Sequence, residues 1–229
     1  MLQRISSRLK QLAVRRSSVG EIPKVDFVPF LPDNPVIVEA GAHVGLDTLE
    51  LARLWKKGTV HAFEPVPVLY RRLRSRTRWQ RNVVTYPLAL GAHDGLATFF
   101  VSSGASNASS SLMEPKEHLL DHPDVAFSQQ IEVQVTTLDS WAAVHGIERV
   151  DFLWLDMQGF ELSVLQAAPR ILSKVCAIYT EVFLKESYLK VPLYQEVRAW
   201  LAEQGFRVER EVLPWIDAGN VLFVRENRA

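Results

Sequence analysis

The sequence predicts an α/β fold in which a mostly parallel sheet is covered by helices on both faces. From residue 36 onward, short apolar runs alternate with segments of helical spacing, which is typical of repeated strand–helix units. Several of these runs, such as VDFLWLD at 150–156, are apolar throughout, as strands buried on both faces are. The chain has 229 residues, 48% of them hydrophobic, which fits one large domain better than two.

The expected elements follow one another from residue 35 to residue 226. Strands are assigned to short apolar or β-branched runs, and helices to segments whose apolar residues recur three or four positions apart. The expected strands of the main sheet are 35–41, 58–65, 82–91, 150–156, 175–184, 207–213 and 220–226, of which the last two form an antiparallel pair. The expected helices are 47–55, 68–78, 137–146, 161–172 and 194–205, and two further strands at 97–101 and 131–136 bracket an inserted loop.

Residues 1–35 are expected to precede this domain, which spans 36–229. The first twenty residues carry five basic side chains and no acid, and their apolar residues could share one helix face. A frayed or docked basic helix is the preferred interpretation, and a membrane-surface helix or an organelle transit peptide is the alternative. Residues 23–35 contain four prolines and read as an irregular lead-in.

The charge balance and cysteine content exclude several classes of protein. Basic and acidic residues both number 26, so the net charge is zero, which disfavours a globally basic nucleic-acid binder and predicts no DNA partner. A single cysteine, Cys176, rules out an internal disulfide and fits a cytoplasmic location. No segment is long and apolar enough to predict a transmembrane helix.

The stretch VIVEAGAHVGLDTLELA, residues 36–52, raises the first functional hypothesis. In an open α/β sheet the loop after a strand lies at the carboxyl edge, where ligands bind. Gly41 and Gly45 would allow a tight turn and close approach of a ligand, and the following helix would point free N–H groups at the same place. The alternative is a glycine turn that only joins a strand to a helix.

Glu64 strengthens the hypothesis of a nucleoside site. It ends the second strand about twenty residues after the glycines, where a carboxylate can accept hydrogen bonds from ribose hydroxyls. A third glycine for a pyrophosphate is absent, and Glu39 would repel a diphosphate but attract a cation. S-adenosyl-L-methionine, which has a sulfonium, an ammonium and a ribose but no phosphate, therefore suits the site better than NAD or ATP.

At this point the chain resembles the FkbM family of S-adenosylmethionine-dependent methyltransferases. The resemblance covers about residues 36–225 and rests on VEAGAHVGLDTL, AFEPVP, LALGAHDG, SNASSSL, VTTLDSW and VDFLWLDMQGFELSVLQAA. It implies a Rossmann-like class I methyltransferase fold with seven strands, the last antiparallel. The expected strands agree with this number once the pair at 97–136 is set apart as a β insertion after strand three. It also implies methylation of hydroxyls on sugars, glycolipids or natural products. His43 departs from the family pattern, because an asparagine usually stands there.

The glycine turn and the resemblance together predict the site residues. The cofactor-binding set is Glu39, Gly41, Ala42, His43, Gly45, Asp47, Thr48, Glu64, Pro65, Ala89, Asp156 and Gln158. The catalytic candidates are Asp156, His43 and Glu181.

Asp156 is the leading candidate for a general base, since it ends a buried strand at the crevice; a role limited to positioning is the alternative. Glu161 is explained as a helix cap, with substrate binding second. Glu181 is expected to face the crevice too. With Asp156 it could form a metal pair, but no third dependable ligand is apparent, so no metal site is predicted.

Other polar segments leave alternatives open. The Ser102–Ala126 segment is expected to be a substrate lid or a plain surface loop, and His118 or His122 could be the base if it closes. Six arginines between 71 and 81 are interpreted as a solvated helix face. Because arginines can bind RNA, they leave methylation of RNA or of amines as an alternative function. A further alternative is that the protein has lost catalysis and is a nucleoside-binding module. A homodimer through the basic N-terminal helix or through the strand pair at 97–136 is left open by the sequence.

Overall fold

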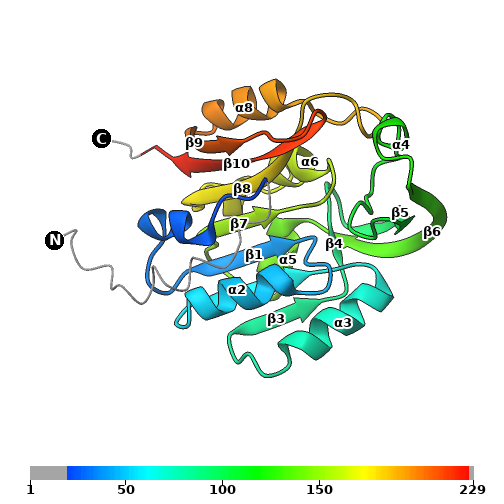
Figure 1. The fold of residues 1–229 in the computed structure, drawn as a ribbon. Coiled ribbons are helices and arrows are strands. Elements are labelled where there is room, and N and C mark those ends of the chain that lie inside the picture. The colour runs from blue at the N-terminus through cyan, green and yellow to red at the C-terminus, as the bar shows by residue number, and fades with distance from the viewer. Residues whose placement is uncertain (1–19, 227–229) are drawn as a thin grey trace.

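The structure is a computed structural model that describes residues 20–226, and it is built around a seven-stranded sheet (Figure 1). The strand order is β3-β2-β1-β7-β8-β10-β9. The seventh strand of this sheet along the chain, β10, runs antiparallel to both of its neighbours, and the other pairings are parallel, as predicted. The strands are β1 (Val36–Ala40), β2 (Thr59–Phe63), β3 (Val83–Tyr86), β7 (Phe152–Leu155), β8 (Ala177–Phe183), β9 (Phe206–Val212) and β10 (Ala218–Arg225).

Helices cover both faces of the sheet because alternate side chains of its strands point to opposite sides. One face packs against α5, α6, α7 and α8, and the other against α2 and a short 3-10 helix, η1, of the lead-in; α3 flanks the β2–β3 edge. The helices are η1 (Lys24–Phe30), α2 (Leu46–Leu54), α3 (Pro67–Thr77), α4 (His118–Asp121), α5 (Leu138–Val144), α6 (Glu161–Gln166), α7 (Pro169–Leu172) and α8 (Tyr194–Glu203).

The predicted insertion after strand three is a second sheet beside the carboxyl edge of the first (Figure 1). Its order is β4-β6-β5, with β4 (Ala89–Leu90), β5 (Gly95–Gly104) and β6 (Val125–Thr136). The two long strands are antiparallel and extend beyond the ranges predicted for them. The loop between them, which contains α4, leans toward the carboxyl edge of the main sheet (Figure 1).

Two elements that were predicted to be continuous are each broken in two. The strand expected at 82–91 breaks at Pro87, and its second part, β4, joins the small sheet instead of the main one. The helix expected at 161–172 is two helices, α6 and α7, because Pro169 cannot continue an α-helix and starts a new one as its first residue. The lead-in at 23–35, predicted to be irregular, contains η1.

The basic segment predicted at 1–19 lies outside the described residues. Among the helices of residues 20–226, none combines the length and apolarity that a bilayer crossing would need.

Strand register brings the predicted site residues together. β1 pairs in parallel with β2 on one side and β7 on the other, so that Ala40 lies beside Phe63 and Leu155. The residues that follow these strand ends, Gly41, Glu64 and Asp156, therefore meet at one edge of the sheet.

Candidate active site

The turn after β1 requires glycine at its first position. Gly41 has φ of +82°, and a Cβ built on it would lie 1.8 Å from the carbonyl oxygen of Asp156. Its N–H donates to the carbonyl oxygen of Phe63 at 3.2 Å, and the N–H of Asp156 donates to that of Ala40 at 3.0 Å. The turn is thus wedged between the ends of β2 and β7, with no space for a side chain.

Gly45, the second glycine of the turn, caps α2 with φ of +79°. A Cβ there would lie 2.6 Å from Cδ1 of Leu73 in α3. The residue therefore lets the first turn of α2 pack against α3 and aims the free N–H groups of that turn toward the carboxyl edge of the sheet.

The side chain of Glu64 is held by backbone N–H groups of two different loops. Its side chain is buried; Oε2 accepts the N–H of His43 at 2.9 Å and Oε1 accepts the N–H of Val66 at 2.8 Å. Burial raises the pKa of this carboxyl to about 7, although the two N–H donors oppose the shift. Each oxygen has further acceptor capacity, which the predicted contact with two ribose hydroxyls requires.

A cavity opens in front of Glu64 and Asp156. Its walls combine the turn after β1, the ends of β2 and β7, and the inserted loop. It is lined by Ala40, Gly41, His43, Phe63, Glu64, Pro65, Leu69, Leu88, Ala89, Leu90, Phe99, Asn107, Ala108, Ser110, Leu112, Asp156, Met157 and Phe160. A mainly apolar wall with a few polar groups is what a nucleoside needs, because the base is flat and weakly polar while the ribose carries hydroxyls.

Asp156 and Glu181 meet at the side-chain amide of Gln158. The amide Nε2 lies 2.9 Å from Oδ1 of Asp156 and 2.6 Å from Oε2 of Glu181. The pKa of Asp156 is raised because the surrounding protein displaces water from the carboxylate, and the charges of Asp47 and Glu21 add to the shift. The pKa of Glu181 is raised well above the ordinary range, by burial first and then by Asp156. Burial and the mutual repulsion of the two carboxyls therefore favour a single negative charge on the pair.

Comparisons with known proteins agree with this geometry. A family model for the methyltransferase FkbM domain matches residues 39–208, which is most of the chain. The chain belongs to the FkbM methyltransferase family. It is an S-adenosylmethionine-dependent methyltransferase, and its fold is the Rossmann-like class I fold that the sequence predicted.

Two curated relatives carry methyltransferase names. 2-O-methyltransferase NoeI of Sinorhizobium fredii is 31% identical over 182 residues, which cover 77% of this chain and 72% of the relative. Methyltransferase 1 of Beauveria bassiana is 31% identical over 159 residues, covering 62% of this chain and 61% of the relative.

Solved structures show the same fold at low sequence identity. An FkbM methyltransferase from Methylobacillus flagellatus superposes with a TM-score of 0.54 at 15% identity, covering 84% of this chain. The present chain spans 44% of that longer protein. Fibrillarin from Aeropyrum pernix, whose structure contains S-adenosyl-L-methionine, superposes with a TM-score of 0.50 at 15% identity and covers 85% of this chain and 69% of its own.

The residues present in this FkbM protein fit that cofactor. Gly41 leaves the turn without a side chain, Glu64 presents a fixed carboxylate, and the apolar walls of the cavity accommodate a flat base. Six residues of the set predicted from sequence line the cavity: Gly41, His43, Glu64, Pro65, Ala89 and Asp156. The lining formed by residues 20–226 does not include Glu39, Ala42, Gly45, Asp47, Thr48, Gln158 or Glu181, so direct contact of these with the cofactor stays a prediction.

Glu39 points to the α2 face of the sheet rather than into the cavity. Its side chain is 1% exposed, and the hydroxyl of Thr48 in α2 is the polar group that lies against it. Burial raises the pKa of Glu39 to about 8; the Thr48 hydroxyl opposes this shift and the nearby charge of Asp47 adds to it. Below that pH the ligand-free protein holds Glu39 in its neutral form, which avoids a buried charge.

Replacing Glu39 by glutamine is expected to flatten the pH dependence of stability. Because its folded-state pKa is raised, Glu39 contributes stability that is present below about pH 4.5, its unfolded value, and is lost as the pH rises to about 8. In that window the lost stability is about 1.4 kcal/mol per pH unit. Denaturant melts of the ligand-free protein between pH 5 and 8 should show a smaller decline for Glu39→Gln. Equal slopes for both proteins would contradict a neutral, buried Glu39.

The inserted loop contributes residues that the sequence did not assign to the cofactor site. Oδ1 of Asn107 accepts a hydrogen bond from Nε2 of His43 at 2.9 Å, and Ala108, Ser110 and Leu112 of the loop, with Phe99 of β5, also line the cavity. The pKa of His43 is lowered by burial, while the bond to Asn107 opposes the shift. His43 is thus neutral near pH 7 and tethers the loop to the glycine turn. In the sequence, the SNASSSL stretch was the feature from which a contact of this loop with the site could have been predicted.

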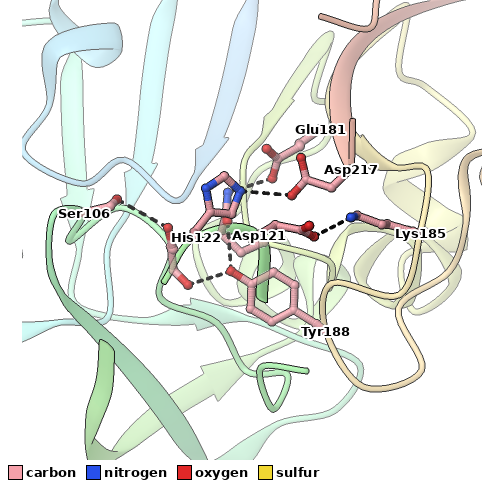
Figure 2. A network of polar contacts seen from close by, with 9 residues as sticks. Ser106, Asp121, His122, Glu181, Lys185, Tyr188 and Asp217 are labelled. Carbon is pink, nitrogen blue, oxygen red and sulfur yellow. Dashed lines mark hydrogen bonds and ion pairs between the residues drawn. The ribbon is translucent and has the colours of Figure 1, made fainter. Parts of the chain in front are cut away.

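The other polar candidates have structural partners. His118 is buried against Tyr188 and Phe127. His122 lies 3.1 Å from Oδ2 of Asp217 (Figure 2). Neither histidine belongs to the cavity lining of the described chain. Glu161 accepts the N–H of Met157 at 2.7 Å, so it closes the turn after β7 in the manner of a cap.

The arginines at 71–81 are all exposed, five of them on α3 or directly after it, which agrees with a solvated helix face. The described residues contain no group of three or more histidine, cysteine or acidic side chains arranged to hold a metal ion.

Proposed function

We propose that this FkbM methyltransferase methylates a hydroxyl oxygen of a sugar, glycolipid or natural-product acceptor, with Asp156 as the general base, and that it works in the cytoplasm. The observation that carries the proposal is the Asp156 carboxylate. It lines the cavity on the far side of the glycine turn from Glu64 and is fixed by the amide of Gln158. The 2-O-methyltransferase name of the Sinorhizobium relative, at 31% identity, supports an oxygen acceptor.

The chemistry divides between the cofactor and the chain. When bound, S-adenosylmethionine supplies a methyl group made electrophilic by its sulfonium. Asp156 removes the proton of the acceptor hydroxyl, which makes a poor nucleophile reactive. The raised pKa of Asp156 makes it a stronger base than an ordinary aspartate, while still ionised near neutral pH. The loop at Asn107–Leu112, which roofs the cavity, excludes water from the transfer.

The direct test is transfer of a labelled methyl group from S-adenosylmethionine to a panel of p-nitrophenyl glycosides of fucose, rhamnose, glucose and N-acetylglucosamine. We expect methyl ethers at a ring hydroxyl, located by mass spectrometry and NMR. The same assay with glucosamine, short peptides and single-stranded RNA represents the amine and RNA alternatives. Methylation restricted to nitrogen or to RNA would overturn the proposal. Binding of the cofactor without transfer to any acceptor would favour a nucleoside-binding module.

Glu64→Gln is expected to lower affinity for S-adenosylmethionine about 10- to 100-fold. A hydrogen bond to a charged group contributes about 1.5–3 kcal/mol, and the neutral amide presents one acceptor oxygen in place of two. Isothermal titration calorimetry measures the change, with Glu203→Gln, an exposed acid on α8, as the matched control. Unchanged affinity in Glu64→Gln would show that this side chain does not contact the ribose.

A further inference from the structure

Tyr188 lies in the connection between β8 and α8, and its ring is 0% exposed, packed against Phe183, Phe127 and His118. Its hydroxyl lies 2.8 Å from the carbonyl oxygen of Ser109 in the inserted loop and 3.0 Å from Oε1 of Gln158 (Figure 2). The one hydroxyl proton can serve both acceptors. The buried hydroxyl of Tyr188 thus connects the inserted loop, which lines the cavity, to the Gln158 amide, which binds both Asp156 and Glu181.

The Gln158 amide is held at both of its ends. An ionised carboxylate only accepts, so the NH2 group faces Asp156 and Glu181, at 2.9 and 2.6 Å. The carbonyl oxygen at the other end accepts from the Tyr188 hydroxyl, and loss of that hydroxyl would leave a buried acceptor without its partner. The backbone of Gln158 is held as well, because its carbonyl oxygen accepts the hydroxyl of Ser111 at 2.8 Å. The remaining freedom of the residue is rotation of its amide, and Tyr188 restricts that rotation.

We propose that Tyr188 is a positioning residue for methyl transfer: through the Gln158 amide, its hydroxyl holds Asp156 and Glu181 together and couples their arrangement to the inserted loop at Ser109. The inference rests on the proposed role of Asp156 as the base. The N–H of Gln158 stabilises the ionised form of Asp156 and so opposes the rise in its pKa. If the amide turns its oxygen toward the carboxylates, that stabilisation is lost and a repulsive contact replaces it.

The first test needs no acceptor. In ligand-free protein labelled with ¹³C at the aspartate and glutamate carboxyl carbons, NMR titration follows Asp156 and Glu181 directly, with Asp156→Asn and Glu181→Gln assigning the signals. Tyr188→Phe keeps the ring and removes the donor. We expect the pKa of Asp156 to rise by roughly half to one unit in this variant. The matched control is Tyr194→Phe, which removes the hydroxyl of another buried tyrosine, one that donates to the carboxylate of Glu211 away from the site.

The second test uses the sugar acceptor that the wild-type enzyme methylates. In Tyr188→Phe, kcat is expected to fall about two- to threefold at pH 6.5 and less at pH 8.5. The base must be ionised, and a higher pKa moves the acid limb of the profile to higher pH. The dissociation constant for S-adenosylmethionine should stay within about twofold. A merely structural role for Tyr188 would reduce kcat equally at both pH values.

A double-mutant cycle with Gln158→Met decides whether Tyr188 acts through Gln158. If it does, adding Tyr188→Phe to Gln158→Met changes neither kcat nor the pKa of Asp156 further. Additive effects, or an unshifted Asp156 titration in Tyr188→Phe, would overturn the inference. If Tyr188→Phe does not fold, Gln158→Met is tested alone, and it is expected to raise the pKa of Asp156. An unchanged pKa in Gln158→Met would then overturn the inference. Failure of the proposed function would be recognised separately, because in that case the wild-type enzyme itself would not methylate a hydroxyl.

Discussion

Replacing Asp156 by asparagine is expected to lower kcat by about 10²–10⁴-fold, the range that a positioned general base contributes. Asparagine has nearly the same shape but cannot take a proton. The hydrogen bond from Gln158 can be kept, since the amide oxygen of asparagine accepts it, and the backbone that wedges Gly41 is unchanged. Affinity for S-adenosylmethionine should therefore stay within about threefold, which separates loss of the base from loss of the cofactor.

The measurement is single-turnover methyl transfer to the sugar acceptor, together with calorimetry for the cofactor. Asp33→Asn makes the same chemical change on the opposite edge of the sheet, where the side chain is 94% exposed, and should leave both quantities unaltered. If Asp156→Asn keeps its kcat and loses affinity instead, Asp156 positions the cofactor and is not the base, which was the alternative interpretation from the sequence.

The roles of the two carboxyl groups differ because their environments differ. Asp156 opens onto the cavity, whereas Glu181 lies outside the lining formed by the described residues, and burial raises the pKa of both. A carboxyl that stays protonated beside an ionised one acts as a hydrogen-bond donor rather than as a base. This asymmetry explains how two acids can share one amide nitrogen without both carrying a charge.

The convergence of Gly41, Glu64 and Asp156 could be predicted from the sequence because it depends on local rules. Each residue follows an apolar strand, and the carboxyl ends of parallel strands share one edge of the sheet. The breaks of the third strand at Pro87 and of the helix at Pro169 could also have been predicted from the sequence, because proline lacks a backbone N–H donor and restricts the residue before it.

The contacts made by the inserted loop could not be predicted in this way. The bond between His43 and Asn107 joins residues 64 positions apart, and that between Tyr188 and Ser109 joins residues 79 positions apart. Neither follows from periodicity or from a strand end, because each depends on how a long loop folds back over the sheet. For Glu39 the sequence predicted the position in the chain, two residues before Gly41, but not the direction of the side chain. Because side chains alternate along a strand, that of Glu39 points to the α2 face.

Gly41→Ala is expected to have the largest effect on the intact protein. A methyl group at this position would lie 1.8 Å from the backbone carbonyl oxygen of Asp156, so the turn and the end of β7 would have to separate. That movement would displace the loop bearing Asp156 and break the bond from Gly41 to Phe63. We expect unfolding free energy to fall by more than about 3 kcal/mol and affinity for S-adenosylmethionine to fall more than about 100-fold.

Gly146→Ala separates the two causes of this effect. Gly146 also has a positive φ, +65°, but a Cβ there would meet no atom of the described residues within 4 Å. It should therefore show the cost of backbone strain alone, about 1–2 kcal/mol, with cofactor binding intact. Chemical denaturation and calorimetry on both variants give the comparison. If Gly41→Ala matches Gly146→Ala in stability and still binds the cofactor, the close packing of this turn against the end of β7 is not what shapes the cofactor site.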